Sequence, residues 1–274
     1  MKIALIGYGK MGRLLEARLL ERGHQVVAVV DPFITPGTGG CSASGELASG
    51  AVVYASLEDA LKGKKGRSLA DADAALEFSL PDKAVGNLLF LATKKIPVVT
   101  GTTGWYEKLP EVRAAVNAAG SSLVWSSNFS LGVNLFYRIA AYAAKLADPF
   151  KEYDVAGFET HHNNKADSPS GTAKTLVERV LAQMTRKKKA VYQMLDRKPE
   201  ADELHYASLR VGSVPGVHSL IFDSAADTIE ITHSARSREG LAAGAVLAVE
   251  WLGAKKRTGV FTVDDVLADI LPQS

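Results

Sequence analysis

Three side chains that can carry a positive charge lie close together in the segment ETHHNNKADSPSGTAKTL, residues 159–176. They are His161, His162 and Lys165. Grouped cations attract acidic molecules, so a site built from them is suited to binding carboxylates. Polar stretches of this kind are more often solvated surface loops. The question is whether this segment is such a loop or a carboxylate-binding site.

The sequence directly after these residues has the features of a helix start. Ser170 is a good N-cap, and it leaves the backbone N–H groups of Gly171 and Thr172 available to an anion. Together with the three potential cations, this favours an acidic small-molecule substrate such as a dicarboxylate. A metal site is the competing interpretation, but a His-His pair with Asp167 lacks a standard ligand spacing and Lys165 would repel a cation. We therefore expect no metal.

A second motif lies near the N-terminus, where GYGKMG (residues 7–12) matches the GxGxxG pattern of dinucleotide-binding proteins. It follows a predicted strand and opens a predicted helix, and this context makes the motif specific. The first glycine permits a tight turn, the second lets the backbone approach a pyrophosphate, and the third allows close packing of helix and strand. The expected cofactor-binding residues are Gly7, Gly9, Lys10, Met11 and Gly12.

Asp31 ends the second predicted strand, about 20 positions after the glycine motif. Its carboxylate is placed to accept hydrogen bonds from the adenosine ribose, which favours NADH over NADPH. A 2′-phosphate would need a neighbouring cation, and the next residues are Pro32 and Phe33. Lys10 or Arg13 could still reach such a phosphate, so NADPH stays the alternative cofactor.

Two further polar loops follow predicted strands, at the edge where open α/β sheets bind their ligands. One is GTTG at 101–104 and the other is SSNF at 126–129. Both could be ordinary turns, but their small polar residues could also bind a nicotinamide and its ribose. The segment FSLP (78–81) ends a third strand and could lie along the cofactor. The expected contacts from the two loops are Gly101, Thr102, Thr103, Ser126, Ser127, Asn128 and Phe129.

The elements that carry these loops alternate between strand and helix in the first half of the chain. Short apolar runs such as KIALIG are typical of strands buried on both faces of a parallel sheet. After about residue 128 the pattern changes to one long helix and several strands with period-2 alternation. The sequence predicts an α/β fold, with a Rossmann-like doubly wound parallel sheet in residues 1–127 and 239–274 and a second, α+β domain in residues 128–238.

Composition sets limits on the protein's partners. The chain has 274 residues, a formal net charge of +2 and 47% hydrophobic residues, which is ordinary for a globular protein and does not indicate nucleic-acid binding. The basic run at 186–189 is expected to be a solvated helix end. Cys41 is the only cysteine, a usage typical of reducing compartments. No apolar stretch is long enough to cross a membrane, so we expect no membrane association and a cytoplasmic location.

Six sequence blocks resemble the dihydrodipicolinate reductase family, now called 4-hydroxy-tetrahydrodipicolinate reductase, in their order and spacing. The most specific is the pattern E-x-H-H-x-x-K-x-D-x-P-S-G-T-A. The resemblance covers essentially the whole chain and implies an NAD(P)H-dependent reductase of diaminopimelate and lysine biosynthesis. It also implies a Rossmann-like cofactor domain and a substrate domain that forms a homotetramer through its sheet. The blocks are GYGKMGRLL, VTGTTGW, SSNFSLGVN, ETHHNNKADSPSGTA, RVGSVPGVHSLIF and THSARSREGLAAGAV.

The resemblance also implies roles for particular residues. His161 and Lys165 would form the catalytic pair, with Lys165 the expected proton donor. Arg238, in the sequence ARSR, matches a position near the cofactor. The substrate-binding residues implied by the resemblance are His162, Lys165, Gly171 and Thr172.

The implied reaction adds a hydride at one carbon of a cyclic, imine-conjugated dicarboxylate and a proton at its neighbour. Since a nicotinamide supplies only the hydride, the protein must orient it and supply the proton. Lys165 would act as acid and carboxylate partner, while His161 would orient it or share the proton. The chain departs from the family pattern at Asp31-Pro32, where many relatives have an acidic residue followed by arginine. Segments 33–50, expected to be a mobile loop, and 186–203 match no family motif.

Two other classes of protein share parts of this pattern. Another two-domain NAD(P)-dependent dehydrogenase acting on a small carboxylate would have the glycine motif, but not the His-His-x-x-Lys block before Ser-Gly-Thr. A non-enzymatic NAD-binding sensor would have the cofactor site without the catalytic cations. His218 and His233 lie on predicted strands and are expected to be core or interface histidines.

Overall fold

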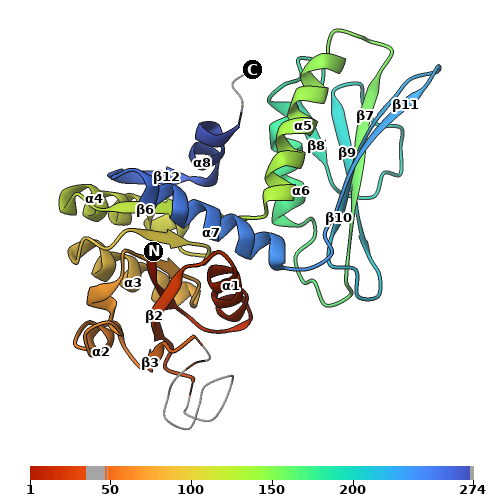
Figure 1. The fold of residues 1–274 in the computed structure, drawn as a ribbon. Helices are drawn as coiled ribbons and strands as arrows, with labels where there is room; N and C mark the ends of the chain where they lie inside the picture. Colours follow the sequence, from red (N-terminus) through yellow and green to blue (C-terminus); the bar gives the residue numbers. More distant parts are fainter. Residues whose placement is uncertain (35–46, 48, 272–274) are drawn as a thin grey trace. The chain divides into compact units, whose positions relative to one another are not determined.

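The computed structural model describes residues 1–34, 47 and 49–271, and the chain forms two compact units (Figure 1). Unit 1 comprises Met1–Ser130 and Arg238–Ser274, and unit 2 comprises Leu131–Ser237. These limits lie within three residues of the domain boundaries expected from the sequence. The predicted mobile loop at 33–50, which includes Cys41, falls largely outside the described residues.

Unit 1 is built on a seven-stranded sheet of order β12-β6-β5-β4-β1-β2-β3, and its described strand pairs are all parallel. The inner strands are buried along nearly their whole length, which explains their continuous runs of Val, Ile, Leu and Ala. The strands are β1 (Lys2–Ile6), β2 (Gln25–Val30), β3 (Val52–Tyr54), β4 (Ala74–Glu77), β5 (Val98–Thr100), β6 (Ser122–Trp125) and β12 (Gly259–Thr262).

The predicted helices of this unit are present. One of them, α3, begins at Pro81, where a proline is tolerated because the N–H that it lacks would have no helical partner in the first turn. The edge strands β3 and β12 and the last helix, α8, were not predicted. The helices are α1 (Lys10–Glu21), α2 (Leu57–Leu61), α3 (Pro81–Thr93), α4 (Leu109–Ala119), α7 (Glu239–Ala254) and α8 (Val263–Ile270), with 3-10 turns at Leu69–Asp71 and Tyr106–Lys108.

The helix α7 returns the chain to unit 1, where it packs on α1 and on the strands β4, β5 and β6. Gly244, in the middle of α7, lies directly against the carbonyl group of Phe129. A Cβ atom at position 244 would be 1.7 Å from that oxygen, so only glycine permits this approach.

Unit 2 contains a mixed five-stranded sheet of order β11-β10-β7-β9-β8. The strand β10 pairs antiparallel with β7 and β11, and β9 pairs parallel with β7 and β8. Two helices, α5 (Leu131–Ala147) and α6 (Gly171–Leu181), cover one face of the sheet, and the apolar core lies between them and the strands (Figure 1). The strands are β7 (Asp154–His161), β8 (Lys189–Val191), β9 (Glu203–Arg210), β10 (Val217–Asp223) and β11 (Thr228–Ser234).

The basic run at 186–189 is not the solvated helix end that the sequence suggested. Lys187 is buried, and its Nζ lies 2.5 Å from a carboxylate oxygen of Asp154 and 2.7 Å from the carbonyl oxygen of Glu203. Burial of an ammonium group requires such partners, and neither neighbour could be inferred from the run itself. Among the described residues, every helix is too short or too polar to span a membrane.

Candidate active site

The glycine loop between β1 and α1 has the close packing that its motif predicts. Gly7 has a φ of 89°, and a Cβ there would lie 2.4 Å from the carbonyl oxygen of Phe78. A Cβ on Gly12 would lie 2.4 Å from the carbonyl oxygen of Gly7. Gly9 is the N-cap of α1, and the space around its Cβ position is open for 4 Å. The loop therefore fits a pyrophosphate, which would bind the N–H groups of the first helical turn.

Asp31 lies beside this loop with a buried carboxylate. Its Oδ2 accepts a hydrogen bond from the Tyr8 N–H at 2.7 Å, and its Oδ1 accepts one from the Phe33 N–H at 2.9 Å. These bonds fix the glycine loop to the end of β2. Each carboxylate oxygen still has lone-pair capacity for a ribose hydroxyl.

A cavity of about 720 Å³ opens beside Asp31 and is lined by Gly7 and Gly9. Its size lies in the range of small-molecule sites. The segment from Phe78 to Leu80 forms part of the wall, as the sequence suggested, and Arg13 contributes a cation. Wall residues that sequence reasoning missed are Tyr8, Ser56, Leu57, Lys83, Asn87 and Phe90.

The loop after β5 reaches the same edge of the sheet as the glycine loop, because the strands are parallel. A Cβ on Gly101 would lie 2.2 Å from a ring carbon of Phe78, so the loop packs directly on the cavity wall. Gly104 has a φ of 82°, which favours glycine. Thr102 is buried and Thr103 is exposed, so Thr103 is the side chain that a ligand can reach.

The loop after β6 is more enclosed. The Ser126 hydroxyl accepts a hydrogen bond from the Asn128 N–H at 3.1 Å, and Ser127 is exposed. Phe129 is buried, with its ring centroid 6.2 Å from that of Phe78. Its side chain therefore packs behind Phe78 in the cavity wall.

Of the expected cofactor residues, Gly7, Gly9 and Asp31 line the cavity, and the others do not. Lys10 is exposed and Met11 is half-buried in the first turn of α1. Arg238 is exposed at the N-cap of α7. The structure brings none of the three side chains against the cavity.

The opening polar segment begins on β7, in unit 2. Residues along β7 alternate between exposed and buried, and the buried set faces the helices. Glu159 and His161 are two positions apart and both belong to the buried set. The strand thus carries both groups to its carboxyl end, where the loop to α6 begins.

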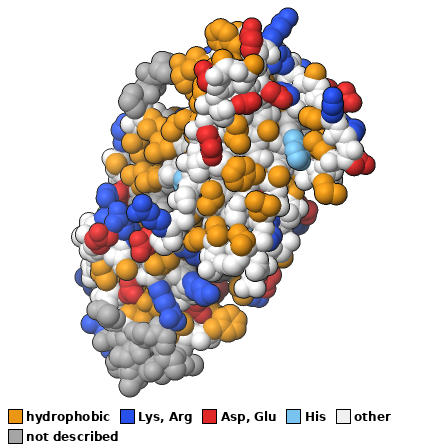
Figure 2. Space-filling view, turned by 90° about the vertical axis from the view of Figure 1, so that its right-hand side faces the viewer, with side chains coloured by type: hydrophobic (Ala, Val, Ile, Leu, Met, Phe, Trp, Pro, Cys, Tyr) orange, Lys and Arg blue, Asp and Glu red, His pale blue; other side chains and the backbone are white. Residues whose placement is uncertain are grey.

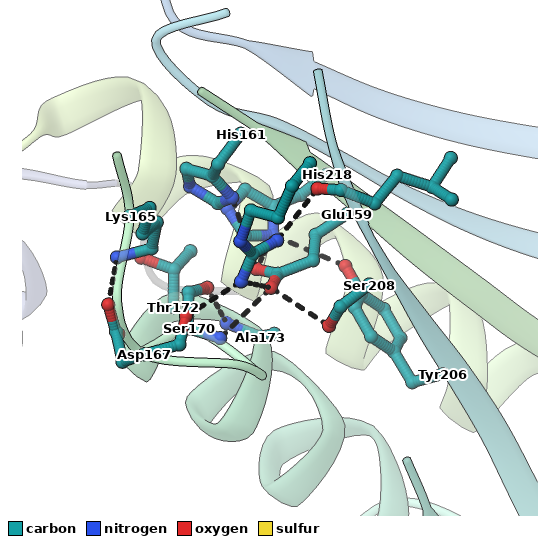
Figure 3. A network of polar contacts seen from close by, with 12 residues as sticks. Glu159, His161, Lys165, Asp167, Ser170, Thr172, Ala173, Tyr206, Ser208 and His218 are labelled. Atoms are coloured by element: carbon teal, nitrogen blue, oxygen red, sulfur yellow. Dashed lines mark hydrogen bonds and ion pairs between the residues drawn. The ribbon is translucent and has the colours of Figure 1, made fainter. Parts of the chain in front are cut away.

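Glu159 is fully buried and lies at the centre of a polar network (Figure 3). Its Oε1 accepts hydrogen bonds from the Ser170 N–H and the Ser208 hydroxyl, both at 3.0 Å, and from Arg210 Nη2 at 3.1 Å. Burial alone would raise the pKa of Glu159, but the hydrogen bonds outweigh it and the pKa is lowered. The group is therefore a carboxylate at neutral pH.

His161 contacts this carboxylate and a second histidine. Its Nδ1 lies 3.4 Å from Glu159 Oε2, and its ring packs edge-on against His218 at 5.1 Å between centroids. Burial lowers the pKa of His161, and the nearby positive charges of Lys165 and Arg210 lower it further. His218 is buried, and burial lowers its pKa to about 4. It is a core histidine, as expected, but it also forms a wall of the site.

The start of α6 already binds a carboxylate, which belongs to the chain itself. Lys165 Nζ lies 2.7 Å from Asp167 Oδ1 (Figure 3), and the Gly171 backbone also hydrogen-bonds to this side chain. These donors, Lys165 foremost, lower the pKa of Asp167. Ser170 caps α6 as predicted, by accepting a hydrogen bond from the Ala173 N–H at 3.1 Å.

Two other expected substrate residues lie beside this helix start. His162 directly follows β7 and is half-buried, and its Nδ1 has no hydrogen bond within the described chain. Thr172 is half-buried in the first turn of α6, where its carbonyl oxygen accepts a hydrogen bond from the Tyr137 hydroxyl at 3.3 Å. The structure thus brings His161, His162, Lys165, Gly171 and Thr172 into one region of unit 2.

One cluster of side chains has a spacing that a metal ion could use. Ligand atoms of Glu159, His161 and His218 lie within 4.8 Å of one another. However, Arg210 bonds to the same carboxylate and Lys165 lowers the pKa of both histidines through its charge. Two nearby cations oppose a metal ion, so we interpret the cluster as a hydrogen-bonded network.

Several residues of the network were not assigned from the sequence. Glu159 could have been found, because positions i and i+2 of a strand share a face. Four others lie on β9 and β10, whose pairing with β7 depends on long-range register, and Asp167 lies in the loop between β7 and α6. The missed residues are Glu159, Asp167, Tyr206, Ser208, Arg210 and His218.

A dinucleotide-binding unit and a separate unit with clustered cations define a two-unit, nicotinamide-dependent oxidoreductase. Comparison with known proteins identifies its family. The profile of the dihydrodipicolinate reductase N-terminus matches residues 1–129, and that of its C-terminus matches residues 132–267. The chain belongs to the dihydrodipicolinate reductase family.

Full-length relatives support this assignment. The 4-hydroxy-tetrahydrodipicolinate reductase of Christiangramia forsetii is 37% identical, covering 98% of this chain and 99% of the relative. The enzyme of the same name from Archaeoglobus fulgidus is 35% identical, covering 97% and 100%. A dipicolinate-bound dihydrodipicolinate reductase from a Paenisporosarcina species has the same fold, with a TM-score of 0.74 at 21% identity over 99% of both chains.

Proposed function

We propose that this protein reduces 4-hydroxy-tetrahydrodipicolinate to tetrahydrodipicolinate with a reduced nicotinamide cofactor, in the diaminopimelate and lysine pathway. The observation that carries the proposal is the cationic cluster of unit 2, where Lys165 and the start of α6 already hold a carboxylate. The names of the full-length relatives and the dicarboxylate bound to the structural relative support the same substrate class.

The cofactor would bind in unit 1, with its pyrophosphate at the start of α1 and its adenosine in the cavity beside Asp31. When bound, it supplies a hydride to the substrate. We infer a preference for NADH, because the Asp31 carboxylate would repel a 2′-phosphate and can accept hydrogen bonds from a free ribose hydroxyl. Arg13 and Lys83 also line this cavity, and they are the groups through which NADPH would bind.

The substrate's carboxylates would be held by Lys165, His162 and the N–H groups of Gly171 and Thr172. One of them would replace the carboxylate of Asp167 at the start of α6. Two bound carboxylates would hold the ring in one orientation, and such orientation contributes strongly to catalysis.

Lys165 is the proton donor in this proposal, and His161 is neutral in the resting enzyme. His161 is enclosed, and its pKa is lowered by burial and by two cations, so it carries no proton to donate at neutral pH. An uncharged imidazole can instead accept a proton or hydrogen-bond to the ammonium group of Lys165. In this arrangement Lys165 donates the proton, and His161 orients Lys165 or accepts a proton from it.

A coupled assay tests this function directly. The product of dihydrodipicolinate synthase is supplied, and the loss of NADH absorbance is followed, then the assay is repeated with NADPH. We expect rapid substrate-dependent oxidation of NADH and a lower kcat/KM for NADPH. Equal kcat/KM values would contradict the cofactor preference alone, whereas no oxidation of either cofactor would contradict the reaction.

We also propose that the protein is a homotetramer formed through the sheet of unit 2. The face of this sheet opposite α5 and α6 is not covered by a helix of the same unit, and Leu209 and Val211 are 54% and 53% exposed. These residues follow Ala207 at alternate positions, on the face opposite Ser208 and Arg210. Hydrophobic side chains gather in patches on the face of the molecule that Figure 2 shows.

A further inference from the structure

The two oxygens of the buried Glu159 carboxylate have different surroundings. Oε1 accepts three hydrogen bonds, from a backbone N–H, a hydroxyl and a guanidinium group. Oε2 accepts none within the described chain, although it is buried. A buried oxygen without a donor is costly, so a donor belongs at this position. The nearest ring nitrogens are Nδ1 of His161 at 3.4 Å and Nδ1 of His218 at 3.9 Å.

Tyr206 occupies the His218 nitrogen that could otherwise donate to Glu159 Oε2. The Tyr206 hydroxyl lies 3.2 Å from His218 Nδ1. Burial raises the pKa of Tyr206, so the hydroxyl keeps its proton. Among the described residues His218 Nδ1 is the partner of this hydroxyl, so donation to Nδ1 is the arrangement that satisfies the hydroxyl hydrogen. The Nδ1 of the neutral His218 is then an acceptor and carries no hydrogen to give to Glu159.

His161, unlike His218, has no hydroxyl bonded to its Nδ1. Its Nδ1 is buried and has no hydrogen-bond partner among the described residues. A proton on this nitrogen would satisfy both His161 and Glu159 Oε2 at once. The separation of 3.4 Å is slightly long for a hydrogen bond, as catalytic hydrogen bonds often are before substrate binds.

The other nitrogen of His161 faces a glycine. A Cβ on Gly216 would lie 3.0 Å from His161 Nε2, and Gly216 has a φ of 157°. A side chain at position 216 would therefore crowd this nitrogen, and glycine leaves it uncrowded. The two edges of the ring differ: one faces a buried carboxylate, and the other lies beside the Gly216 backbone.

We propose that Glu159 is a positioning residue that fixes His161 as the Nδ1–H tautomer, so that Nε2 carries the lone pair that takes part in proton transfer. The inference rests on the proposed function for its catalytic meaning, but the tautomer can be measured without it. The charged groups that face His161 are Glu159, Lys165, Asp167 and Arg210, and the neighbouring His218 is neutral.

The first test measures the tautomer in the wild-type protein. Long-range ¹⁵N–¹H NMR distinguishes a protonated Nδ1 from a protonated Nε2, and His161→Asn assigns the resonance. We expect His161 to be neutral at neutral pH with its proton on Nδ1. A proton on Nε2 would overturn the proposal, and this result does not depend on the folding of any Glu159 variant.

The second test compares Glu159→Gln with Ser208→Ala. A glutamine amide at the Oε2 position would donate to Nδ1 and force the proton onto Nε2, so kcat should fall about 100-fold, the lower end of the general acid–base range. NADH affinity and KM should change less than about threefold. The loss of activity at low pH should move to lower pH, because removing the carboxylate lowers the pKa of His161 further.

Ser208→Ala removes a hydrogen bond to Oε1 and leaves Oε2 untouched, so the His161 tautomer should be unchanged and kcat should fall far less than in Glu159→Gln. An unchanged kcat and tautomer in folded Glu159→Gln would contradict the proposal. If wild type has the Nδ1–H tautomer and Glu159→Gln reverses it, but neither form turns over the proposed substrate, the proposed function fails and the positioning role stands.

Discussion

At the scale of single residues, Asp167 occupies the position that the sequence assigned to a substrate carboxylate. In the proposed function, a substrate carboxylate would displace this group from Lys165 and from the start of α6, so the two negative charges would compete. The sequence correctly indicated the helix start, because Ser170 and Gly171 have the residue types of an N-cap and a first helical residue. It did not reveal that the Asp167 carboxylate binds there, since Asp167 was considered only as a metal ligand.

Asp167→Asn should therefore strengthen substrate binding. Removing the competing charge should lower KM for the dicarboxylate about two- to fivefold, the size expected for a partly exposed ion pair. Steady-state kinetics at low ionic strength measure the change, with Asn164→Ala in the same exposed loop as the control. An increase in KM would mean that Asp167 helps to bind substrate and does not compete with it.

His218 couples the stability of the protein to pH. Its pKa is about 4 in the folded protein and about 6.5 in an unfolded chain, so the unfolded state takes up its proton first as the pH falls. As the pH falls from about 6.5 to about 4, this difference lowers the free energy of unfolding by roughly 3 kcal/mol in total. Above about pH 6.5 the group is neutral in both states and costs no stability.

Urea unfolding at several pH values checks this expectation. The free energy of unfolding of wild type should fall more steeply between pH 6.5 and 4 than that of His218→Gln, which lacks the titrating group. Parallel curves for the two proteins would show that His218 does not titrate in this way. His161 and the carboxylates are present in both proteins, so their contributions largely cancel.

At the scale of elements, the long helices and the central strands could be predicted because each has a clear hydrophobic pattern. The strands β3, β8 and β12 are short edge strands whose residues are half-buried or exposed, so they lack the fully buried apolar run that marks the equally short β5. These strands are defined by their pairing partners. Lys187 is a similar case: its burial depends on residues distant in the sequence, and a run of cations does not indicate that one of them is buried.

The contact between α7 and Phe129 gives a test at this scale. Gly244→Ala should destabilise the protein by about 1–3 kcal/mol, because the added methyl group meets a backbone oxygen that cannot rotate away. Gly86→Ala is the matched control, since Gly86 is also inside a helix but has open space at its Cβ position. That change should stabilise by about 0.5–1 kcal/mol. Chemical unfolding of both variants measures the difference, and equal stabilities would contradict the close contact.

At the scale of the whole molecule, the proposed cofactor residues lie in unit 1, with Arg238 at its boundary, and the proposed substrate residues lie in unit 2, so the proposed reaction requires both units. The glycine motif made the first unit predictable from sequence, because its spacing reflects backbone packing. The second unit has no comparably general motif, and its assignment came from the specific His-His-x-x-Lys block. The network behind that block depends on strand register, which only the folded chain defines.

The proposed tetramer gives a prediction at this scale. Leu209→Glu places a charge on the uncovered face of the unit 2 sheet, and burial of that charge in an interface would be costly. Analytical ultracentrifugation should detect a tetramer for wild type and smaller species for the variant. A monomeric wild-type protein at micromolar concentration would contradict the proposed assembly.

The central claim is that the segment from His161 to Thr172 supplies the proton and binds the carboxylates, while unit 1 supplies the hydride donor. Comparing Lys165→Ala with wild type tests it most directly, by measuring kcat with the proposed substrate and the dissociation constant for NADH on the same samples. We expect kcat to fall at least about 100-fold while NADH affinity stays within about twofold. A variant that retains its kcat, or loses activity only because it no longer binds NADH, would contradict the account.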